Sequence, residues 1–256
     1  MRLALFGYGR MGRAVEAVAL ERGHEVALRL DGAANPDGAG VTPDALRDVD
    51  VAVDFSVGDA VARNVEGAAA QGVDVVVGTT GWEGERERVF RAVEDAGVGL
   101  LHAPNFSTGV HLFLRLAALA GDLAGAAEGY DVHAIDAHHR HKRDHPSGTA
   151  RRLAELLVER VPGKERWSAD LPADGPIPPD LLHVAVSRLG EEAGSHAVIL
   201  DGPDDRIEVR HTARGRTGFA RGAVVAAEWI RGRRGIHTMD DLLRDRLGEG
   251  GSDDHR

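Results

Sequence analysis

The sequence contains no cysteine, and this absence excludes several kinds of chemistry at once. Disulfide bonds, cysteine-ligated zinc, iron–sulfur clusters and thiol nucleophiles all require that residue. Aromatic residues are scarce, at 4% of the chain, so the core must rely on valine, leucine and alanine. No apolar run approaches the roughly 18–20 residues of a membrane span, and the N-terminus lacks the pattern of a signal peptide. We therefore expect a cytoplasmic protein that does not contact a membrane.

A surplus of positive charge is absent as well. The chain of 256 residues has 31 lysines and arginines against 41 acidic residues, a net charge of −10 with histidine neutral. Proteins that bind nucleic acid usually carry a basic surface, so we expect no nucleic-acid partner. The length suffices for one large or two modest domains.

The first hundred residues alternate short apolar runs with longer amphipathic segments. Near-continuous apolar runs are typical of strands buried on both faces of a parallel sheet. The alternation predicts a doubly wound, Rossmann-type α/β domain. The predicted strands are Leu3–Phe6, Glu25–Leu30, Asp50–Ser56, Val73–Gly78 and Val98–Ala103, and the predicted helices are Met11–Arg22, Asp59–Gln71 and Glu85–Ala96, with glycines at the ends of two of them, Gly23 and Gly72.

The pattern changes after Asn105 and predicts a second, α+β domain. Its runs of alternating residues indicate a mixed or antiparallel sheet, and the turn "DGPDD" predicts a hairpin between the last two strands. Two further helices near the C-terminus could pack on either domain, and the tail from Gly248 is expected to be disordered. The expected elements are helix Gly109–Ala124, strand Tyr130–His139, a helix with Ala150, Leu153, Leu156 and Leu157 on one face, strands Leu182–Leu189, His196–Leu200 and Arg206–Thr212, and helices Gly222–Arg231 and Met239–Leu247.

The motif "GYGRMG" places Gly7, Gly9 and Gly12 directly after the first strand and at the start of a helix. This spacing at a first βα turn predicts dinucleotide binding, with the pyrophosphate at the helix N-terminus. Asp31 ends the second strand, where an acid accepts hydrogen bonds from ribose hydroxyls and disfavours a 2′-phosphate. We therefore favour NADH over NADPH, although both stay open. A purely structural glycine turn is the alternative.

The stretch "VVVGTTGW" (Val75–Trp82) forms another loop at the carboxyl end of a strand. Ligands of open α/β sheets lie along that edge, so the small residues and hydroxyls of this loop favour a place beside a nicotinamide. A small-residue turn before a helix is the simpler alternative.

The stretch "DAHHRHKRDHPSGTA" (Asp136–Ala150) gathers four histidines, two arginines and a lysine in an acidic protein. The neighbouring cations and the sequential histidines argue against a metal site. A bound dicarboxylate suits the cluster better, because basic side chains and a helix N-terminus at Ser147-Gly148-Thr149 both attract anions. A histidine among bound carboxylates is a natural proton donor. The alternative is a solvated basic loop whose hydroxyls merely cap a helix.

The string "HHRHKRDHPSGTA" resembles the signature of the dihydrodipicolinate reductase (4-hydroxy-tetrahydrodipicolinate reductase) family. The motifs "GYGRMG", "DFS" (Asp54–Ser56), "GTTGW" (Gly78–Trp82), "APNFSTGV" (Ala103–Val110) and "IEVRHTARGRTGFARGA" (Ile207–Ala223) follow the family in the same order, so the resemblance spans nearly the whole chain.

This resemblance implies an NAD(P)H-dependent reductase of diaminopimelate and lysine biosynthesis that works as a homotetramer. It makes His138 the general acid and Lys142 the residue that holds a substrate carboxylate. It places residues 1–105, completed by 219–256, in the dinucleotide-binding domain and residues 106–218 in a domain for substrate binding and oligomerisation. The implied substrate contacts are His139, Ser147, Gly148, Thr149 and Arg216, and the implied cofactor contacts are Gly7, Tyr8, Gly9, Arg10, Met11, Gly12, Asp31, Phe55, Gly78, Thr79, Thr80, Ala103, Pro104, Asn105 and Phe106.

Other functions fit the sequence less well. Two-domain sugar dehydrogenases begin with a similar glycine loop, but their "EKP"-like motif is absent. Semialdehyde reductases need a catalytic cysteine. A dinucleotide sensor without catalysis would not require the His-His-Lys and Ser-Gly-Thr groups.

Overall fold

The computed structural model describes residues 1–127 and 129–248, which divide into two compact units. The first unit comprises Met1–Ser107 together with the chain from Arg216 onward, and the second comprises Thr108–Gly215. The borders expected from the sequence, after residues 105 and 218, lie two and three residues away. The roles assigned to the two domains stay predictions. The expected disordered tail lies outside the described residues from position 249 on.

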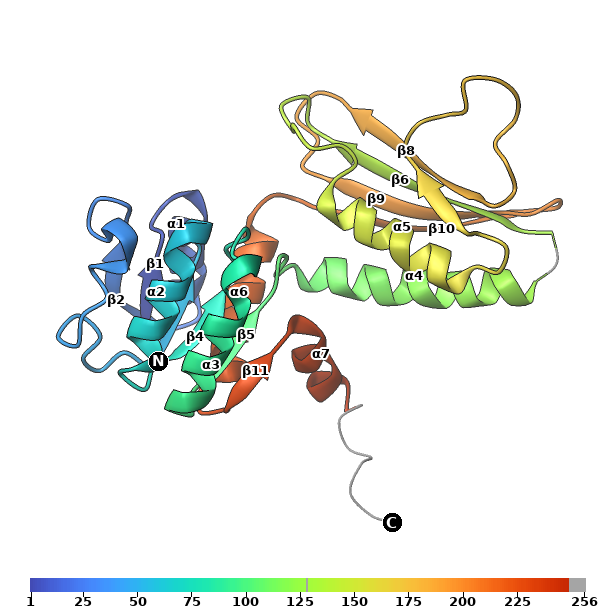
Figure 1. The fold of residues 1–256 in the computed structure, drawn as a ribbon. Coiled ribbons are helices and arrows are strands. Elements are labelled where there is room, and N and C mark those ends of the chain that lie inside the picture. Colours follow the sequence, from blue (N-terminus) through green and yellow to red (C-terminus); the bar gives the residue numbers. More distant parts are fainter. Residues whose placement is uncertain (128, 249–256) are drawn as a thin grey trace, which may run out of the picture. The chain divides into compact units, whose positions relative to one another are not determined.

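The first unit is built on a six-stranded sheet in the order β11-β5-β4-β3-β1-β2, with every pair parallel (Figure 1). All five predicted strands and three predicted helices are present, with ends shifted by at most two residues. A three-residue strand, β11, was not predicted. The elements are β1 Arg2–Phe6, α1 Arg10–Glu21, β2 Glu25–Leu30, η1 Pro36–Gly38, β3 Val51–Asp54, α2 Gly58–Ala69, β4 Asp74–Val77, η2 Glu83–Glu85, α3 Arg86–Ala96, β5 Gly99–His102, α6 Thr217–Ile230, β11 Gly235–His237 and α7 Met239–Leu247.

Helices cover both faces of this sheet because successive strand residues point to opposite sides. Leu3 and Leu5 of β1 pack in one cluster with α1, α6 and α7, whereas Ala4 and Phe6 pack in another with α2 and α3. Helix α6 begins five residues before the predicted Gly222 and places seven buried residues in the first cluster. The sheet is therefore buried on both faces, as its apolar runs predicted.

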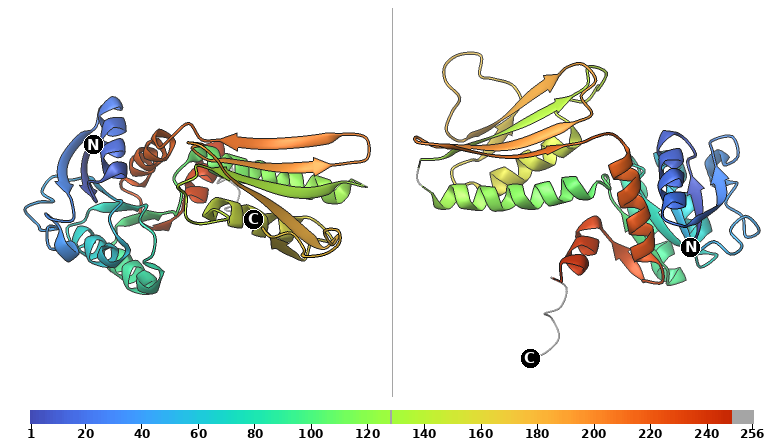
Figure 2. Two further views of the ribbon diagram at one scale, coloured as in Figure 1. Left: turned by 90° about the horizontal axis from the view of Figure 1, so that it is seen from above. Right: turned by 180° about the vertical axis from the view of Figure 1, so that it is seen from behind.

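The second unit has a five-stranded mixed sheet in the order β10-β9-β6-β8-β7. The predicted hairpin between β9 and β10 is confirmed, and β9 also pairs antiparallel with β6. However, β8 runs parallel to both β6 and β7, so the sheet is mixed. Helices α4 and α5 cover one face (Figure 2). The elements are α4 Thr108–Ala126, β6 Asp131–His138, α5 Gly148–Arg160, β7 Arg166–Ser168, β8 Leu181–Arg188, β9 Ser195–Asp201 and β10 Arg206–Thr212.

Helix α4 corrects one expectation from the sequence. With 19 residues and a mean hydropathy of 1.3, it is long and apolar enough to cross a membrane by length and composition. The core helix of a soluble protein passes the same test, and the inner face of α4 packs in the core of the second unit. Its outer face exposes four leucines, Leu112, Leu116, Leu119 and Leu123.

Candidate active site

The glycine loop between β1 and α1 has two glycines that the protein itself requires. Gly7 has a φ of +88°, and a Cβ there would lie 2.2 Å from the carbonyl oxygen of Phe55. A Cβ at Gly12 would lie 2.5 Å from the carbonyl oxygen of Gly7. Both positions therefore need glycine for the tight turn and for the close packing of α1 against the loop.

Gly9 differs, because no atom lies within 4 Å of a Cβ built there. Packing does not require glycine at this position, which leaves open space above the backbone where a pyrophosphate could approach. Gly9 is the N-cap of helix α1, which has no side-chain cap and no acidic residue in its first turn. Its N–H groups are thus suited to an anion. A cavity of about 580 Å³ adjoins the loop, lined by Gly7, Tyr8, Gly9, Asp31, Gly32, Asn35, Pro36, Phe55, Ser56, Val57 and Ala60.

Asp31 lies just after β2 and lines the same cavity. Its Oδ1 accepts hydrogen bonds from the backbone N–H groups of Ala33 and Ala34, at 3.0 and 2.9 Å. Within the described part of the chain, no side chain or backbone group donates to Oδ2. The carboxylate is therefore oriented and keeps one oxygen for the hydroxyls of a ribose.

Three of the predicted cofactor residues meet at the carboxyl ends of β3, β4 and β5. The Phe55 ring lies on Gly78 so closely that a Cβ there would come within 2.1 Å of its Cε1. Phe106 packs edge-on against Phe55, with ring centroids 5.9 Å apart. The remaining predicted residues flank this edge without lining the cavity: Arg10, Met11, Gly12, Thr79, Thr80, Ala103, Pro104 and Asn105.

Thr79 lies beneath the site as part of a buried polar network around Asp54. Asp54 is completely buried, and its Oδ1 accepts hydrogen bonds from the Ser56 N–H, the Ser56 hydroxyl and the Thr79 hydroxyl. Its Oδ2 accepts one from Asn64, whose own oxygen accepts from Asn35. This network ties the loops after β2, β3 and β4 together through uncharged donors.

In the second unit, the alternation of β6 directs Asp136 and His138 toward the face covered by helices. Val132, Ala134 and Asp136 are buried on that face, and His138 continues the same period of two. The neighbouring strands place His196 of β9 directly opposite Asp136 and Arg188 of β8 directly opposite His138. The register therefore assembles one polar cluster from three strands.

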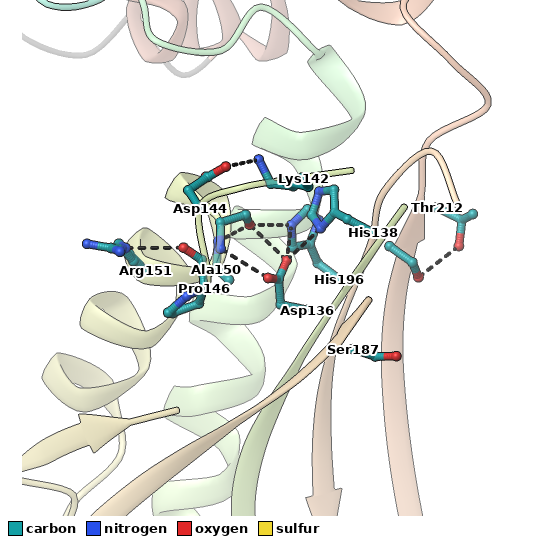
Figure 3. Close-up of polar contacts among 12 residues, drawn as sticks. Asp136, His138, Lys142, Asp144, Pro146, Ala150, Arg151, Ser187, His196 and Thr212 are labelled. Atoms are coloured by element: carbon teal, nitrogen blue, oxygen red, sulfur yellow. Dashed lines mark hydrogen bonds and ion pairs between the residues drawn. The ribbon is translucent and has the colours of Figure 1, made fainter. Parts of the chain in front are cut away.

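Asp136 is the centre of this cluster and is completely buried (Figure 3). Its Oδ2 accepts hydrogen bonds from the Ser147 N–H and from Nη2 of Arg188, both at 3.0 Å. Its Oδ1 accepts one from the Ser147 hydroxyl at 2.8 Å and faces Nδ1 of His138 at 3.0 Å and Nε2 of His196 at 3.3 Å. Burial alone would raise the pKa of Asp136, but hydrogen bonds from His138, His196 and Ser147 hold that pKa well below its ordinary value. Asp136 is therefore ionised at neutral pH.

The loop after β6 carries Lys142 and His139. The Nζ of Lys142 donates to Oδ1 of Asp144 at 2.8 Å, and Arg188 donates to the Asp144 carbonyl oxygen at 2.9 Å. Burial opposes the ionisation of Asp144, yet the hydrogen bond and charge of Lys142, a backbone hydrogen bond and the charge of Arg188 together outweigh it and lower the pKa of that carboxyl. The ring of His139 lies 6.1 Å from that of His141.

The start of α5 gives its three predicted residues different surroundings. Ser147 is buried and caps the helix by accepting from the Ala150 N–H, while its own hydroxyl and N–H both donate to Asp136. Gly148 is exposed and has open space above its Cα, whereas Thr149 is half-buried. Arg216, the N-cap of α6, belongs to the first unit, and its substrate role stays a prediction.

Asp136, His138 and His196 could also hold a metal ion by spacing, since their ligand atoms lie within 4.8 Å of one another. The guanidinium of Arg188 already occupies Oδ2 of the same carboxylate and would repel a cation. The expectation of a site without metal stays a prediction.

Sequence analysis named His138 and Ser147 but missed Asp136, Arg188 and His196. Asp136 gave one usable signal, an acid two residues before a histidine on a predicted strand, which puts both on one face. Arg188 and His196 gave none, because the strand register that brings them to Asp136 is not written in local sequence.

Comparison with known proteins gives a consistent result over the full length. The family described as "Dihydrodipicolinate reductase, N-terminus" matches residues 1–106, and "Dihydrodipicolinate reductase, C-terminus" matches residues 109–243. The 4-hydroxy-tetrahydrodipicolinate reductase of Christiangramia forsetii is 37% identical over 96% of this chain and 98% of its own. That of Thiobacillus denitrificans is 38% identical over 95% and 98%.

Among solved structures, the dipicolinate-bound dihydrodipicolinate reductase of Paenisporosarcina sp. TG-14 superposes with a TM-score of 0.75 at 22% identity, over 93% of this chain and 97% of that one. An engineered D-amino acid dehydrogenase bound to NADP+ reaches 0.53 at 16% identity, over 98% and 99%. These likenesses establish the two-domain dehydrogenase fold.

Proposed function

The chain belongs to the dihydrodipicolinate reductase family, and from this premise we propose that it reduces 4-hydroxy-tetrahydrodipicolinate to tetrahydrodipicolinate in diaminopimelate and lysine biosynthesis. The electron donor is NADH or NADPH, with NADH favoured. When bound, the reduced nicotinamide supplies a hydride to the substrate. The protein supplies the proton and the groups that hold the two carboxylates, and the 4-hydroxyl group leaves as water in the overall conversion.

The observation that carries this proposal is the cluster around His138. An imidazole in contact with a buried, ionised carboxylate is suited to deliver a proton to a carbanionic carbon. His138 keeps 12% of its side-chain surface exposed, so the ring is accessible to a substrate.

The substrate carboxylates have matching partners close to that acid. Lys142 is 23% exposed, and among the described residues its Nζ is paired with the 53% exposed carboxylate of Asp144, which a substrate carboxylate can replace. The exposed N–H of Gly148 and the neighbouring Thr149 open helix α5, where an anion is stabilised by the helix dipole. His139, Ser147 and Arg216 are the other proposed substrate contacts, and Ser147 also caps α5 and donates to Asp136.

The residues of the first unit fit a dinucleotide. Gly9 leaves space for the pyrophosphate, α1 offers its first N–H groups, and Asp31 offers one oriented oxygen to the adenosine ribose. A 2′-phosphate would meet the Asp31 charge, which is why NADH is favoured. Phe55, Gly78, Thr80 and the segment Ala103–Phe106 form the edge beside the nicotinamide.

The assembly and the compartment belong to the same proposal. We place the enzyme in the cytoplasm as a homotetramer that associates through the sheet of the second unit, where Ile207 is exposed on the edge strand β10. Light scattering on the purified protein tests the tetramer directly, and a monomer at micromolar concentration would contradict it.

The test of the activity is the oxidation of NADH and of NADPH, with the substrate generated from pyruvate and aspartate semialdehyde. The wild type should turn over, and His138→Gln should lose roughly 10²–10⁴-fold in kcat, the usual contribution of a general acid. The variant should still bind cofactor. Tight cofactor binding without oxidation by the wild type would contradict the reductase and favour a sensor.

A further inference from the structure

One nitrogen of the His138 ring lies against a buried carboxylate. Nδ1 is 3.0 Å from Oδ1 of Asp136, an ion-pair distance. The ring is turned so that this buried nitrogen makes no aligned hydrogen bond with that oxygen or with any other acceptor among the described residues. Asp136 cannot follow the ring elsewhere, because Ser147 and Arg188 hold both of its oxygens. A fixed carboxylate at Nδ1 favours the tautomer with a proton on that nitrogen. Nε2 is then the nitrogen that gains and loses a proton.

The other edge of the ring meets a backbone that has room for nothing larger than glycine. Gly194 has a φ of +134°, and a Cβ there would lie 2.9 Å from Nε2 and 3.1 Å from Cδ2 of His138. Any side chain at position 194 would therefore force the His138 ring or the backbone beside it to shift. Gly190, in the same connection between β8 and β9, also has a positive φ, of 47°, but nothing lies within 4 Å of its Cβ position.

We propose that Asp136 and Gly194 are positioning residues for His138. The carboxylate fixes the tautomer and the glycine backbone fixes the plane of the ring, so that the proton leaves from Nε2. This inference rests on the proposed function in taking His138 as the acid, but the contacts themselves do not depend on the substrate.

The charged and titratable groups that face His138 come from each strand packed beside it. Asp136 belongs to β6, Arg188 to β8 and His196 to β9, whose ring lies 5.2 Å from that of His138. Lys142 in the following loop is paired with Asp144. Without the carboxylate of Asp136, the ring would face a guanidinium and a second imidazole, both of which disfavour a protonated His138. The alkaline limb of the kcat profile should then move to lower pH.

The first experiment compares Asp136→Asn and Asp136→Glu with Asp131→Asn, a control that changes an exposed carboxylate at the start of the same strand. Asp136→Asn should lose roughly 10²-fold in kcat, shift the alkaline limb downward and leave NADH binding unchanged. Asp136→Glu should recover part of kcat, and Asp131→Asn should match the wild type. In a His138→Gln background, Asp136→Asn should cost nothing more. An unshifted pH profile, or a loss that adds to that of His138→Gln, would overturn the inference.

The second experiment compares Gly194→Ala with Gly190→Ala, which changes a glycine in the same connection whose φ of 47° is close to the left-handed region that alanine can adopt and which has no contact with the ring. Gly194→Ala should lower kcat at least tenfold more than Gly190→Ala at equal cofactor affinity. Equal effects would remove Gly194 from the inference. This pair also decides the matter if Asp136→Asn does not fold.

Nitrogen NMR of the labelled histidines separates the two proposals. The resonances of His138, assigned by their absence from His138→Gln, should show the proton of the neutral ring on Nδ1 in the wild type and a redistribution to Nε2 in Asp136→Asn. If the neutral ring is protonated on Nδ1 but the protein oxidises neither cofactor, the contact between His138 and Asp136 is supported and only the proposed function is contradicted. A neutral ring protonated on Nε2 in an active enzyme would overturn the positioning role.

Discussion

Each unit buries one aspartate completely, and the two are held in different ways. Asp54 of the first unit accepts from hydroxyl, amide and backbone donors, none of which titrates near neutral pH. Asp136 of the second unit accepts from Ser147 but also faces a guanidinium and two imidazoles. The first carboxylate joins loops, whereas the second lies where protons can be exchanged.

This difference indicates how a structural buried carboxylate can be distinguished from one that takes part in chemistry. A buried polar group must be paired wherever it lies, so satisfaction alone does not distinguish structure from chemistry. The kind of hydrogen-bond partner distinguishes the two roles. Neutral donors fix a geometry, while ionisable partners couple that geometry to the charge of a neighbour.

The largest expected effect comes from removing the structural carboxylate. Asp54→Ala leaves the donors of Ser56, Asn64 and Thr79 buried without an acceptor, and we expect a loss of about 3–5 kcal/mol in the free energy of unfolding. Urea unfolding measures it. A loss below about 1 kcal/mol would mean that the network is not needed for the fold. In the second unit the variant for comparison is Asp136→Glu, because it keeps a carboxylate whereas Asp54→Ala removes one.

The glycine loop gives the next contrast, between a structural and a ligand-facing position. Gly7→Ala should cost about 2 kcal/mol or more, because its φ is +88° and its Cβ would clash with Phe55. Gly9→Ala should leave stability within about 0.5 kcal/mol and instead weaken NADH binding about tenfold. Fluorescence titration and urea unfolding on both variants separate the two effects. Equal stability losses would contradict the assignment.

Asp31 is the residue proposed to set the preference for NADH over NADPH. Asp31→Ser should change the ratio of kcat/KM for NADH and NADPH by about tenfold in favour of NADPH, or about 1.4 kcal/mol, because the charge that opposes a 2′-phosphate is gone. Steady-state kinetics with both cofactors measure this ratio. An unchanged ratio would place the discrimination elsewhere in the loop.

The smallest effect is on stability against pH. Burial lowers the pKa of His102 in the first unit and of His133 and His211 in the second. The unfolded chain therefore binds more protons than the folded one below about pH 6.5, and stability should fall as the pH drops from that value through the folded pKa. Urea midpoints at several pH values test this, and His211→Gln should flatten the dependence. A stability that rises on acidification would contradict it.

The first unit could be predicted closely from its sequence because its signals are local. Apolar runs bounded by glycines set the strands, so Glu25–Leu30 was predicted with its observed ends. The strands β7 and β11 escaped prediction because three residues are too few to show a period. The direction of β8 was also missed, since an isolated run of alternating residues does not say which neighbour it pairs with.

The candidate site could be predicted only in part, for a related reason. His138, Lys142 and Ser147 lie in one contiguous string, so the motif names them. The partners that set their state come from elsewhere, Arg188 and His196 being brought to Asp136 by strand register. Ser147 was predicted as a substrate contact, and this stays a prediction, but the bonds from its hydroxyl and N–H to Asp136 could not be foreseen from the motif. Sequence thus reveals the chemical groups more readily than their neighbours.

The first unit is made of two separate segments of the chain, and this affects the order in which the protein folds during its synthesis. Helix α6 and the strand β11 that completes the sheet are the last parts of the described chain, together with α7, to leave the ribosome. Until they do, Leu3, Leu5 and Val53 lack the apolar cover that α6 provides. The second unit, encoded without interruption from Thr108 to Gly215, can finish folding earlier. The first unit is therefore completed after the second, and until then one face of its sheet is an exposed apolar surface.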